Sequence, residues 1–384
     1  MHAAREILNR LVAFPTVSHD SNLALVDWVE TYLAGHGVTS HRVWNDDRTK
    51  ASVYANVGPW EPGGVILSGH SDVVPVDGQV WATDPWTVTE QKGRLYGRGT
   101  SDMKGFVALA LAAVPLALAR GIRRPIQIAL SHDEELGLLG APAMIRAMVQ
   151  TLPRASAVVV GEPSMMRVIT GQKGGAGYRI TLRGHPVHSS RLPYGVSAVM
   201  EAARLIDWIN DENTRIQALV PSALAAPFDP PFTTLHVGRF QGGTANNITA
   251  EHAEFVMEFR IVPGENMADW YRRWEAKIAA VDTAMRKVHP EAGIIVDRFF
   301  DAPPLDPSGT GAAEEMCRRL TGDNGVQVVS YGTEAGQFQA EGYAAVICGP
   351  GDITQAHQAN EFLEIAQFEA GWAFMERLVA DLAA

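Results

Sequence analysis

Short apolar runs, each followed at once by polar or acidic residues, recur in the first and last parts of the chain. Segments with a helical spacing of apolar positions separate them. This alternation predicts an α/β domain whose mixed, largely parallel sheet carries helices on both faces. The runs that we expect to form its strands are residues 64–68, 125–131, 155–160, 327–331 and 344–348.

The stretch between these parts, residues 174–300, has a different pattern. Its order of strand, helix, strand, strand, helix, strand is typical of the split βαβ, or ferredoxin-like, unit. Because the α/β pattern resumes after Pro303, we expect this βαββαβ unit to be an insertion. The predicted domains are 1–173 and 301–384 for the α/β part and 174–300 for the insert. The elements of the insert are expected at 178–182, 196–210, 233–240, 253–261, 267–289 and 293–299.

Composition and charge narrow the class of partner. The chain has 384 residues, of which 46% are hydrophobic and 20% charged, as in ordinary globular proteins. Its formal net charge is −11, which leaves no basic patch to neutralise phosphate or an anionic membrane surface. We therefore expect neither nucleic acid nor a membrane as a partner.

Residues 1–14 have the spacing of an amphipathic helix rather than the unbroken apolar core of a signal peptide. The longest apolar run, residues 106–119, is too short to cross a bilayer and is expected to form a buried helix. Cys317 and Cys348 are the only cysteines, and neither has a metal-binding or redox spacing. These features agree with a cytoplasmic protein.

Residues that could carry chemistry follow the strand ends, where sites form in open α/β sheets. His70 and Asp72 follow the first run. An imidazole there could bind a metal through one nitrogen while the carboxylate accepts a hydrogen bond from the other N–H. Taken alone, the pair is better explained as a strand-end histidine and a turn-forming aspartate.

Two acidic segments extend this pattern. Asp102 precedes a predicted helix; it could bridge two cations with its two oxygens, although capping the helix is the simpler explanation of this segment alone. Asp133, Glu134 and Glu135 crowd like charges together, which costs energy unless solvent or a cation relieves it. An exposed acidic loop would explain them, but the apolar residues on both sides favour the mouth of a site.

Five strand-end positions together are more informative than any one of them. Glu162 follows the run 155–160, and His357 lies in a glycine-rich loop after 344–348. Two histidines and three carboxylates suit a pair of zinc-like ions that share one carboxylate. One acid of the glutamate pair is then left over, and a free carboxylate beside such a site can serve as general base. The expected ligands are His70, Asp102, Glu135, Glu162 and His357.

These motifs resemble those of the dinuclear-zinc family of acetylornithine deacetylases, succinyl-diaminopimelate desuccinylases, aminoacylases and related carboxypeptidases. The resemblance covers essentially the whole chain, and its specificity lies in the combination of motifs. It implies a zinc-peptidase-like fold and an amide hydrolase with two Zn²⁺ ions, which Co²⁺ can replace. The motifs are Gly-His-Ser-Asp-Val-Val-Pro at 69–75, Gly-Arg-Gly-Thr-Ser-Asp-Met-Lys-Gly at 97–105, Asp-Glu-Glu at 133–135, Gly-Glu-Pro at 161–163 and Gln-Ala-His at 355–357.

The resemblance also distributes the ligands between the two ions. It implies that His70, Asp102 and Glu162 hold one zinc. It implies that Asp102, Glu135 and His357 hold the other, with Asp102 as the bridge.

Further roles are implied beside the ligands. Asp72 matches the carboxylate that orients His70, and Glu134 matches the general acid/base. Glu134 would take a proton from the attacking water and return it to the leaving amine. A cis peptide bond is implied between Asp102 and Met103.

The insert resembles the lid of this family, which implies a homodimer contact through it. His188 matches the histidine that supports the oxyanion and, by resemblance, reaches the partner subunit's zinc site; we interpret the nearby His185 as a turn residue. Asn246 and Asn247 match a substrate-contacting pair, although the family's following Ile-Pro is Ile-Thr in this chain. Arg260 matches an arginine that grips the substrate carboxylate, and a surface charge on a strand explains it about as well.

Among the subfamilies, residues 331–336 and 348–351 are most similar to acetylornithine deacetylases. The expected reaction is therefore removal of the acetyl group from N2-acetyl-L-ornithine, a small N-acyl amino acid, in arginine biosynthesis. Glu334 could bind the substrate's ammonium group or merely brace its loop. The alternatives are desuccinylase, aminoacylase or dipeptidase activity or, in another class, a non-catalytic binding protein. No ligand or base is missing, which disfavours the last.

Overall fold

The computed structural model describes residues 1–384, which divide into two compact units. The first consists of Met1–Gly171, Leu305–Val328 and Thr333–Ala384, and the second of Gln172–Pro304 and Val329–Gly332. The second unit is thus inserted between parts of the first. The return of Val329–Gly332 to it was not predicted, because the apolar run there was expected to form one strand of the first domain.

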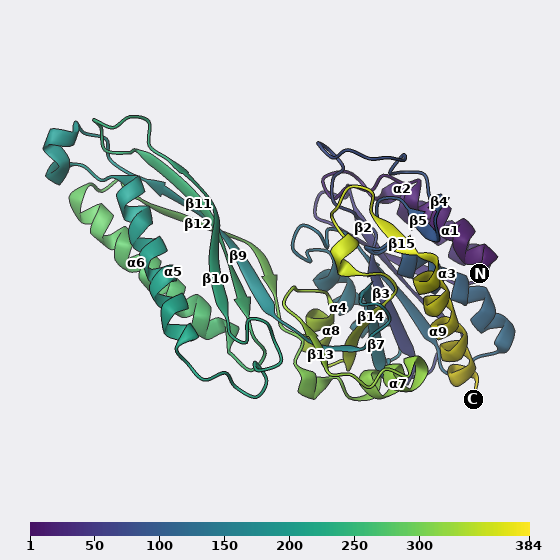
Figure 1. The fold of residues 1–384 in the computed structure, drawn as a ribbon. Helices are drawn as coiled ribbons and strands as arrows, with labels where there is room; N and C mark the ends of the chain where they lie inside the picture. The colour runs from purple at the N-terminus through teal and green to yellow at the C-terminus, as the bar shows by residue number, and fades with distance from the viewer. The chain divides into compact units, whose positions relative to one another are not determined.

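A mixed sheet forms the centre of the first unit (Figure 1). It has eight strands in the order β1-β2-β6-β3-β7-β14-β8-β13. Its middle strands β6, β3, β7 and β14 run parallel, whereas β1–β2, β2–β6 and β8–β14 pair antiparallel. The predicted mixed α/β sheet is confirmed, and β1, β2 and β8 are additional strands. The bounds are β1 (Ser40–Trp44), β2 (Ala51–Val57), β3 (Val65–His70), β6 (Ile126–Ser131), β7 (Ala157–Pro163), β8 (Ile169–Gln172), β13 (Gln327–Val329) and β14 (Ala345–Gly349).

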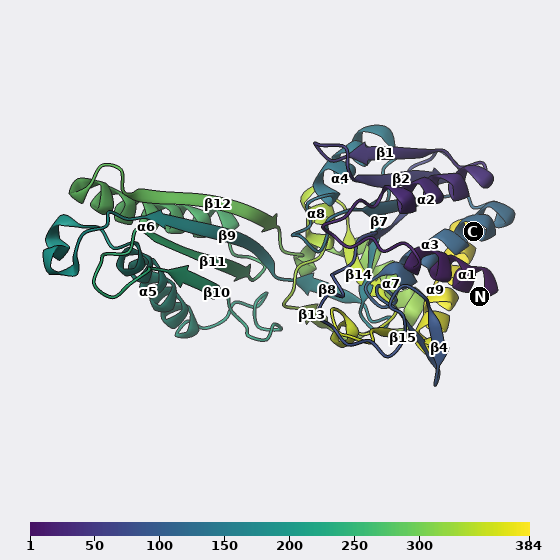
Figure 2. The ribbon, with the colours of Figure 1, turned by 90° about the horizontal axis from the view of Figure 1, so that it is seen from above.

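Helices cover both faces of this sheet (Figure 2). One layer contains α1, α2, α3, α7 and α9, which share a single apolar cluster with the sheet, while α4 and α8 pack on the strands from the other side. The predicted buried helix at 106–119 is confirmed as α3. Its packing on β7 requires glycine at 161, because a Cβ there would lie 1.9 Å from the ring of Phe106. The bounds are α1 (His2–Val12), α2 (Leu23–Gly35), α3 (Lys104–Arg120), α4 (Ala141–Thr151), α7 (Gly311–Thr321), α8 (Ala335–Ala340) and α9 (Ile365–Ala383), with short 3-10 turns η2 (Pro307–Gly309) and η3 (Ile353–Gln355).

A small antiparallel sheet in the order β15-β5-β4 was not predicted, because its strands are only three residues long. It consists of β4 (Thr89–Gln91), β5 (Arg94–Tyr96) and β15 (Phe362–Glu364). Phe362 pairs with Tyr96. This pairing joins the segment before Asp102 to the segment after His357.

The second unit is a four-stranded antiparallel sheet in the order β10-β11-β9-β12, with α5 and α6 on one face (Figure 1). Alternate residues of β11 are buried, so that Phe255, Met257 and Phe259 belong to the apolar core of this unit. The βαββαβ order is that of the split βαβ unit. The bounds are β9 (Gly174–Arg183), η1 (Ser189–Tyr194), α5 (Ala198–Gln217), β10 (Thr234–Gly242), β11 (His252–Ile261), α6 (Met267–Val288) and β12 (Gly293–Ala302).

None of the helices combines the length and the apolar character that crossing a bilayer would require. Both cysteines are buried as free thiols.

Candidate metal centre

The topology of the first sheet gathers the predicted ligands. Because β6, β3, β7 and β14 are parallel neighbours, their carboxyl ends meet at one edge of the sheet. His70 is the last residue of β3, and Glu162 lies at the end of β7. Glu135 follows β6, Asp102 precedes α3, and His357 follows η3 in the loop after β14.

All five side chains come together in two groups that share Asp102. In the first group, ligand atoms of His70, Asp102 and Glu162 lie within 4.8 Å of one another. The same holds in the second group for Asp102, Glu135 and His357. This is the distribution that the family resemblance implies.

Asp102 has the geometry of a bridging carboxylate. Its Oδ1 lies 3.0 Å from His70 Nε2, and its Oδ2 lies 3.3 Å from His357 Nε2. Each oxygen therefore faces a different group. The peptide bond between Asp102 and Met103 is cis, as predicted.

The outer ligands complete each group. Glu162 Oε1 lies 3.7 Å from His70 Nε2, and Glu135 Oε2 lies 3.0 Å from His357 Nε2. Mixed nitrogen and oxygen donors at two histidines and three carboxylates suit zinc-like divalent ions. The donor set therefore fits two cations.

The carboxylates strongly perturb the two histidines. Hydrogen bonds to Asp102 and Glu135 raise the pKa of His357 to about 10. Burial lowers the pKa of His70, but the hydrogen bond to Asp102 and nearby carboxylate charges outweigh it, so the net shift is well above the ordinary value. The concentration of negative charge that holds these protons would equally favour a divalent cation, which binds the neutral imidazole.

Asp72 does not orient His70 in the way that was predicted. The acceptor for His70 Nδ1 is the backbone carbonyl of Asp72, at 2.9 Å, whereas its carboxylate Oδ1 lies 3.7 Å away, beyond hydrogen-bond distance. The carboxylate instead accepts the hydroxyl of Ser18 at 2.8 Å and the backbone N–H groups of Glu134 and Glu135 at 3.2 and 3.3 Å. Asp72 therefore fixes the imidazole through its backbone and the glutamate pair through its side chain.

Glu134 differs from Glu135 in its contacts. Its carboxylate belongs to neither ligand group and makes no hydrogen bond. Burial, followed by the charge of Glu162, raises the pKa of Glu134 well above its ordinary value. A carboxyl group that readily holds a proton, close to the ligands but not among them, suits a general acid/base.

Glu334 is buried in the first unit, with 1% of its surface exposed. Its Oε2 accepts a hydrogen bond from Ser68 at 2.9 Å, and its Oε1 accepts one from Ser131. Ser68 belongs to β3 and Ser131 ends β6, so the carboxylate ties two strands to the start of α8. These contacts favour the bracing role over an ionic contact with a substrate ammonium group.

Sequence reasoning missed a buried ion pair beside the ligands. Arg98 Nη1 lies 2.8 Å from Glu361 Oε2, and both side chains are 1% exposed. Arg98 stands between two glycines of the 97–105 motif, and Glu361 follows His357 by four residues. Their nearness to predicted ligands was the only signal in the sequence.

The second unit brings His188 close to the loop that carries Asn246 and Asn247. His188 forms an isolated bridge with Ile248, and the backbone N–H of Ser189 donates to the carbonyl of Asn247 at 2.9 Å. The imidazole Nδ1 lies 2.8 Å from the hydroxyl of Ser190. His188, Asn246 and Asn247 are all exposed.

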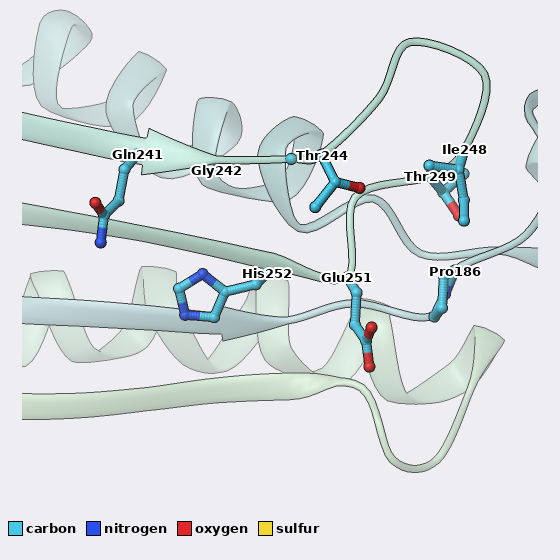
Figure 3. Close-up of a pocket in the computed structure, with 9 residues that line it drawn as sticks. Pro186, Gln241, Gly242, Thr244, Ile248, Thr249, Glu251 and His252 are labelled. Carbon is cyan, nitrogen blue, oxygen red and sulfur yellow. The ribbon is translucent and has the colours of Figure 1, made fainter.

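A cavity of about 370 Å³ lies next to this loop (Figure 3). Its lining comes from the end of β10, the following loop, the start of β11 and Pro186 in the segment after β9. His185 does not line it; the imidazole stacks on that of His289 with ring centroids 3.7 Å apart. Arg260 lies at the far end of β11, where its Nη2 donates to Glu258 at 2.8 Å.

The chain matches the model of peptidase family M20/M25/M40 over residues 66–381. It is 34% identical to an acetylornithine deacetylase from Myxococcus xanthus, over 98% of this chain and 97% of that protein. It is 30% identical to one from Yersinia pseudotuberculosis, over 97% of this chain and 96% of that protein.

Solved structures share the fold. An M20 family metallo-carboxypeptidase from Sulfolobus solfataricus matches with a TM-score of 0.77 and 17% identity over 100% of both chains. A dinuclear metal binding peptidase of the M20 family from Bacillus subtilis matches with a TM-score of 0.64 and 15% identity, over 99% of this chain and 97% of that chain. With the sequence matches, these similarities show a metal-dependent hydrolase of amide bonds. The chain belongs to peptidase family M20/M25/M40.

Proposed function

We propose that the protein hydrolyses an N-acyl amino acid, and that N2-acetyl-L-ornithine is the substrate, giving ornithine and acetate. The observation that carries the hydrolytic part is Asp102, whose two oxygens face two separate groups of metal-ligand type. The substrate is supported by the relatives named acetylornithine deacetylase and by residues 331–336 and 348–351.

Two divalent cations at these groups would supply Lewis acidity toward the amide carbonyl, and we propose zinc, with cobalt as a substitute. Glu134 then takes a proton from the water that attacks the acyl carbon. It returns the proton to the nitrogen as the C–N bond breaks, which leaves a carboxylic acid and a free amine. Glu134 suits this role because its carboxylate lies in neither ligand group and makes no hydrogen bond that would occupy it.

We further infer a homodimer through the second unit, in which each site draws on both chains. His188 is bridged to Ile248, before the start of β11, whereas Arg260 lies near its end. At about 3.4 Å per residue, the strand from His252 to Arg260 is roughly 27 Å long, far more than acetylornithine can span. If His188 supports the oxyanion and Arg260 grips the carboxylate of one substrate, they must come from different chains.

Substrate-panel kinetics test the proposed specificity. We expect kcat/KM of the zinc-loaded protein to be highest for N-acetylornithine among N-acetylornithine, N-acetylmethionine, N-succinyl-diaminopimelate and a dipeptide. A preference for the succinylated substrate or the dipeptide would overturn the proposed substrate while leaving the metal-dependent amide hydrolase in place.

A further inference from the structure

The loop that carries His357 is held by polar contacts rather than by burial. The His357 side chain is 54% exposed, and its backbone has a left-handed φ of 62°. We propose that Gln79, itself held by the buried Arg98–Glu361 pair, is a positioning residue that keeps His357 in place to bind the second cation. This inference rests on the proposed dinuclear metal centre and names residues to which no role has been given so far.

Gln79 connects directly to the backbone of His357. Its Nε2 donates to the His357 carbonyl at 3.0 Å. Its Oε1 accepts from Arg98 Nη2 at 2.6 Å and from Trp81 Nε1 at 3.1 Å. Because guanidinium and indole groups only donate and a backbone carbonyl only accepts, these three contacts define one orientation of the amide.

Arg98 continues the connection into the interior. Its Nη1 donates to the carbonyl of Gln358 at 3.2 Å as well as to Glu361, and its guanidinium carbon lies 5.1 Å from the centre of the Trp81 ring. The side chain is almost fully buried, so its charge depends on these partners for compensation. Arg98 therefore ties the residue after His357 to the loop before α3.

Glu361 holds the loop that presents the bridging carboxylate. Its Oε1 accepts the backbone N–H groups of Ser101 at 2.9 Å and Asp102 at 3.1 Å, and its Oε2 accepts that of Gly99 at 2.9 Å. Because Oε2 also accepts from Arg98, each carboxylate oxygen of Glu361 accepts two hydrogen bonds. The network thus runs from the carbonyl of His357 through Gln79, Arg98 and Glu361 to the N–H of Asp102.

The position of Gln79 predicts a selective effect on one ion. Its side chain donates a hydrogen bond to His357, which belongs only to the second ligand group, and has no hydrogen bond to His70 or Glu162 of the first. Changes to residues that orient metal ligands typically weaken metal binding by about 10- to 100-fold. Loss of Gln79 should therefore weaken the second ion and leave the first nearly unchanged.

The test is equilibrium dialysis of chelator-treated protein against Zn²⁺, with the bound zinc measured by elemental analysis. The variants are Gln79→Ala and Gln79→Glu, and the matched control is Gln91→Ala, an exposed glutamine without a side-chain hydrogen bond. Gln79→Glu still accepts from Arg98 and Trp81 but cannot donate to the carbonyl of His357. We substitute Gln79 rather than Glu361, because loss of Glu361 would leave the buried charge of Arg98 without its partner and could prevent folding.

We expect wild type to bind two ions, and Gln91→Ala to bind two ions with the affinities of wild type. Both Gln79 variants should bind one of their two ions on the order of tenfold less tightly, with turnover restored at high zinc and an unchanged unfolding temperature without metal. Wild-type affinity for both ions in either Gln79 variant, or an equal loss of both ions, would overturn the positioning role. Failure of wild type to bind zinc would instead overturn the metal centre itself, and this inference with it.

Discussion

Glu134 and Glu135 are neighbours in the chain but have different surroundings. Glu135 Oε2 lies 3.0 Å from His357 Nε2 in a ligand group, whereas the carboxylate of Glu134 has no hydrogen-bond partner. Glu134→Gln should therefore keep its zinc but lose about 10²- to 10⁴-fold in kcat, because an amide cannot accept the proton of water. Glu135→Gln should lose one ion. Metal content and kcat of the two variants check this, and an equal loss of zinc in both would refute the assignment of base and ligand.

Glu334 is a residue whose role depends on contacts that no motif reveals. Because its carboxylate accepts from Ser68 and Ser131, Glu334→Ala should lower the free energy of unfolding by about 1–3 kcal/mol. The variant's kcat/KM should decrease by the same factor for N-acetylornithine and for N-acetylmethionine. The measurement is the ratio of kcat/KM for the two substrates, beside an unfolding curve. A loss confined to N-acetylornithine, whose side chain carries an ammonium group, would restore the ionic role.

At the scale of elements, the ligands could be predicted because each follows an apolar run that ends in polar residues. His70 and Glu162 end β3 and β7, and parallel strands bring such ends to one edge. Gln79 and Glu361 could not be predicted in this way. They act through hydrogen bonds between loops, which depend on the path of the chain rather than on a local pattern. The strands β4, β5 and β15 were missed because a strand of three residues is too short to show a periodic pattern.

Lys173 joins β8 to β9 and provides a test of the second unit. It is buried, and its Nζ donates to the carbonyls of Pro230 and Phe232, both at 2.8 Å. Burial lowers its pKa to about 8, below the value of about 10.4 for an unfolded chain. Between these values the unfolded state binds more protons, so this group makes the protein more stable as the pH rises from about 8 to about 10.

Lys173→Met removes this titration, so thermal unfolding midpoints should rise less with pH in the variant than in wild type. The matched control is Lys287→Met, in the exposed last turn of α6. Unfolding measured at about pH 8, 9 and 10 checks the expectation. Identical pH dependence in wild type and Lys173→Met would show that Lys173 titrates in the folded protein as it does in the unfolded chain.

At the scale of the whole molecule, the proposed homodimer makes a prediction about mixed assemblies. If His188 serves the partner's site, His188→Ala and Glu134→Gln chains should each be nearly inactive alone. One site of a mixed dimer would then combine an intact Glu134 with the partner's intact His188. Each mixed dimer should recover up to about half of the activity of a wild-type dimer, because one of its two sites is complete. Verified mixed dimers without recovered turnover would place His188 in its own chain's site or outside catalysis.

In the proposed mechanism, two cations held by groups that share Asp102 enable this chain to hydrolyse an acyl amino acid. The direct test is a zinc titration of chelator-treated protein, with acetate release from N-acetylornithine plotted against bound zinc per chain. We expect no turnover without zinc and a plateau as binding approaches two ions per chain, one for each ligand group. Full turnover by protein that contains no bound metal would contradict it.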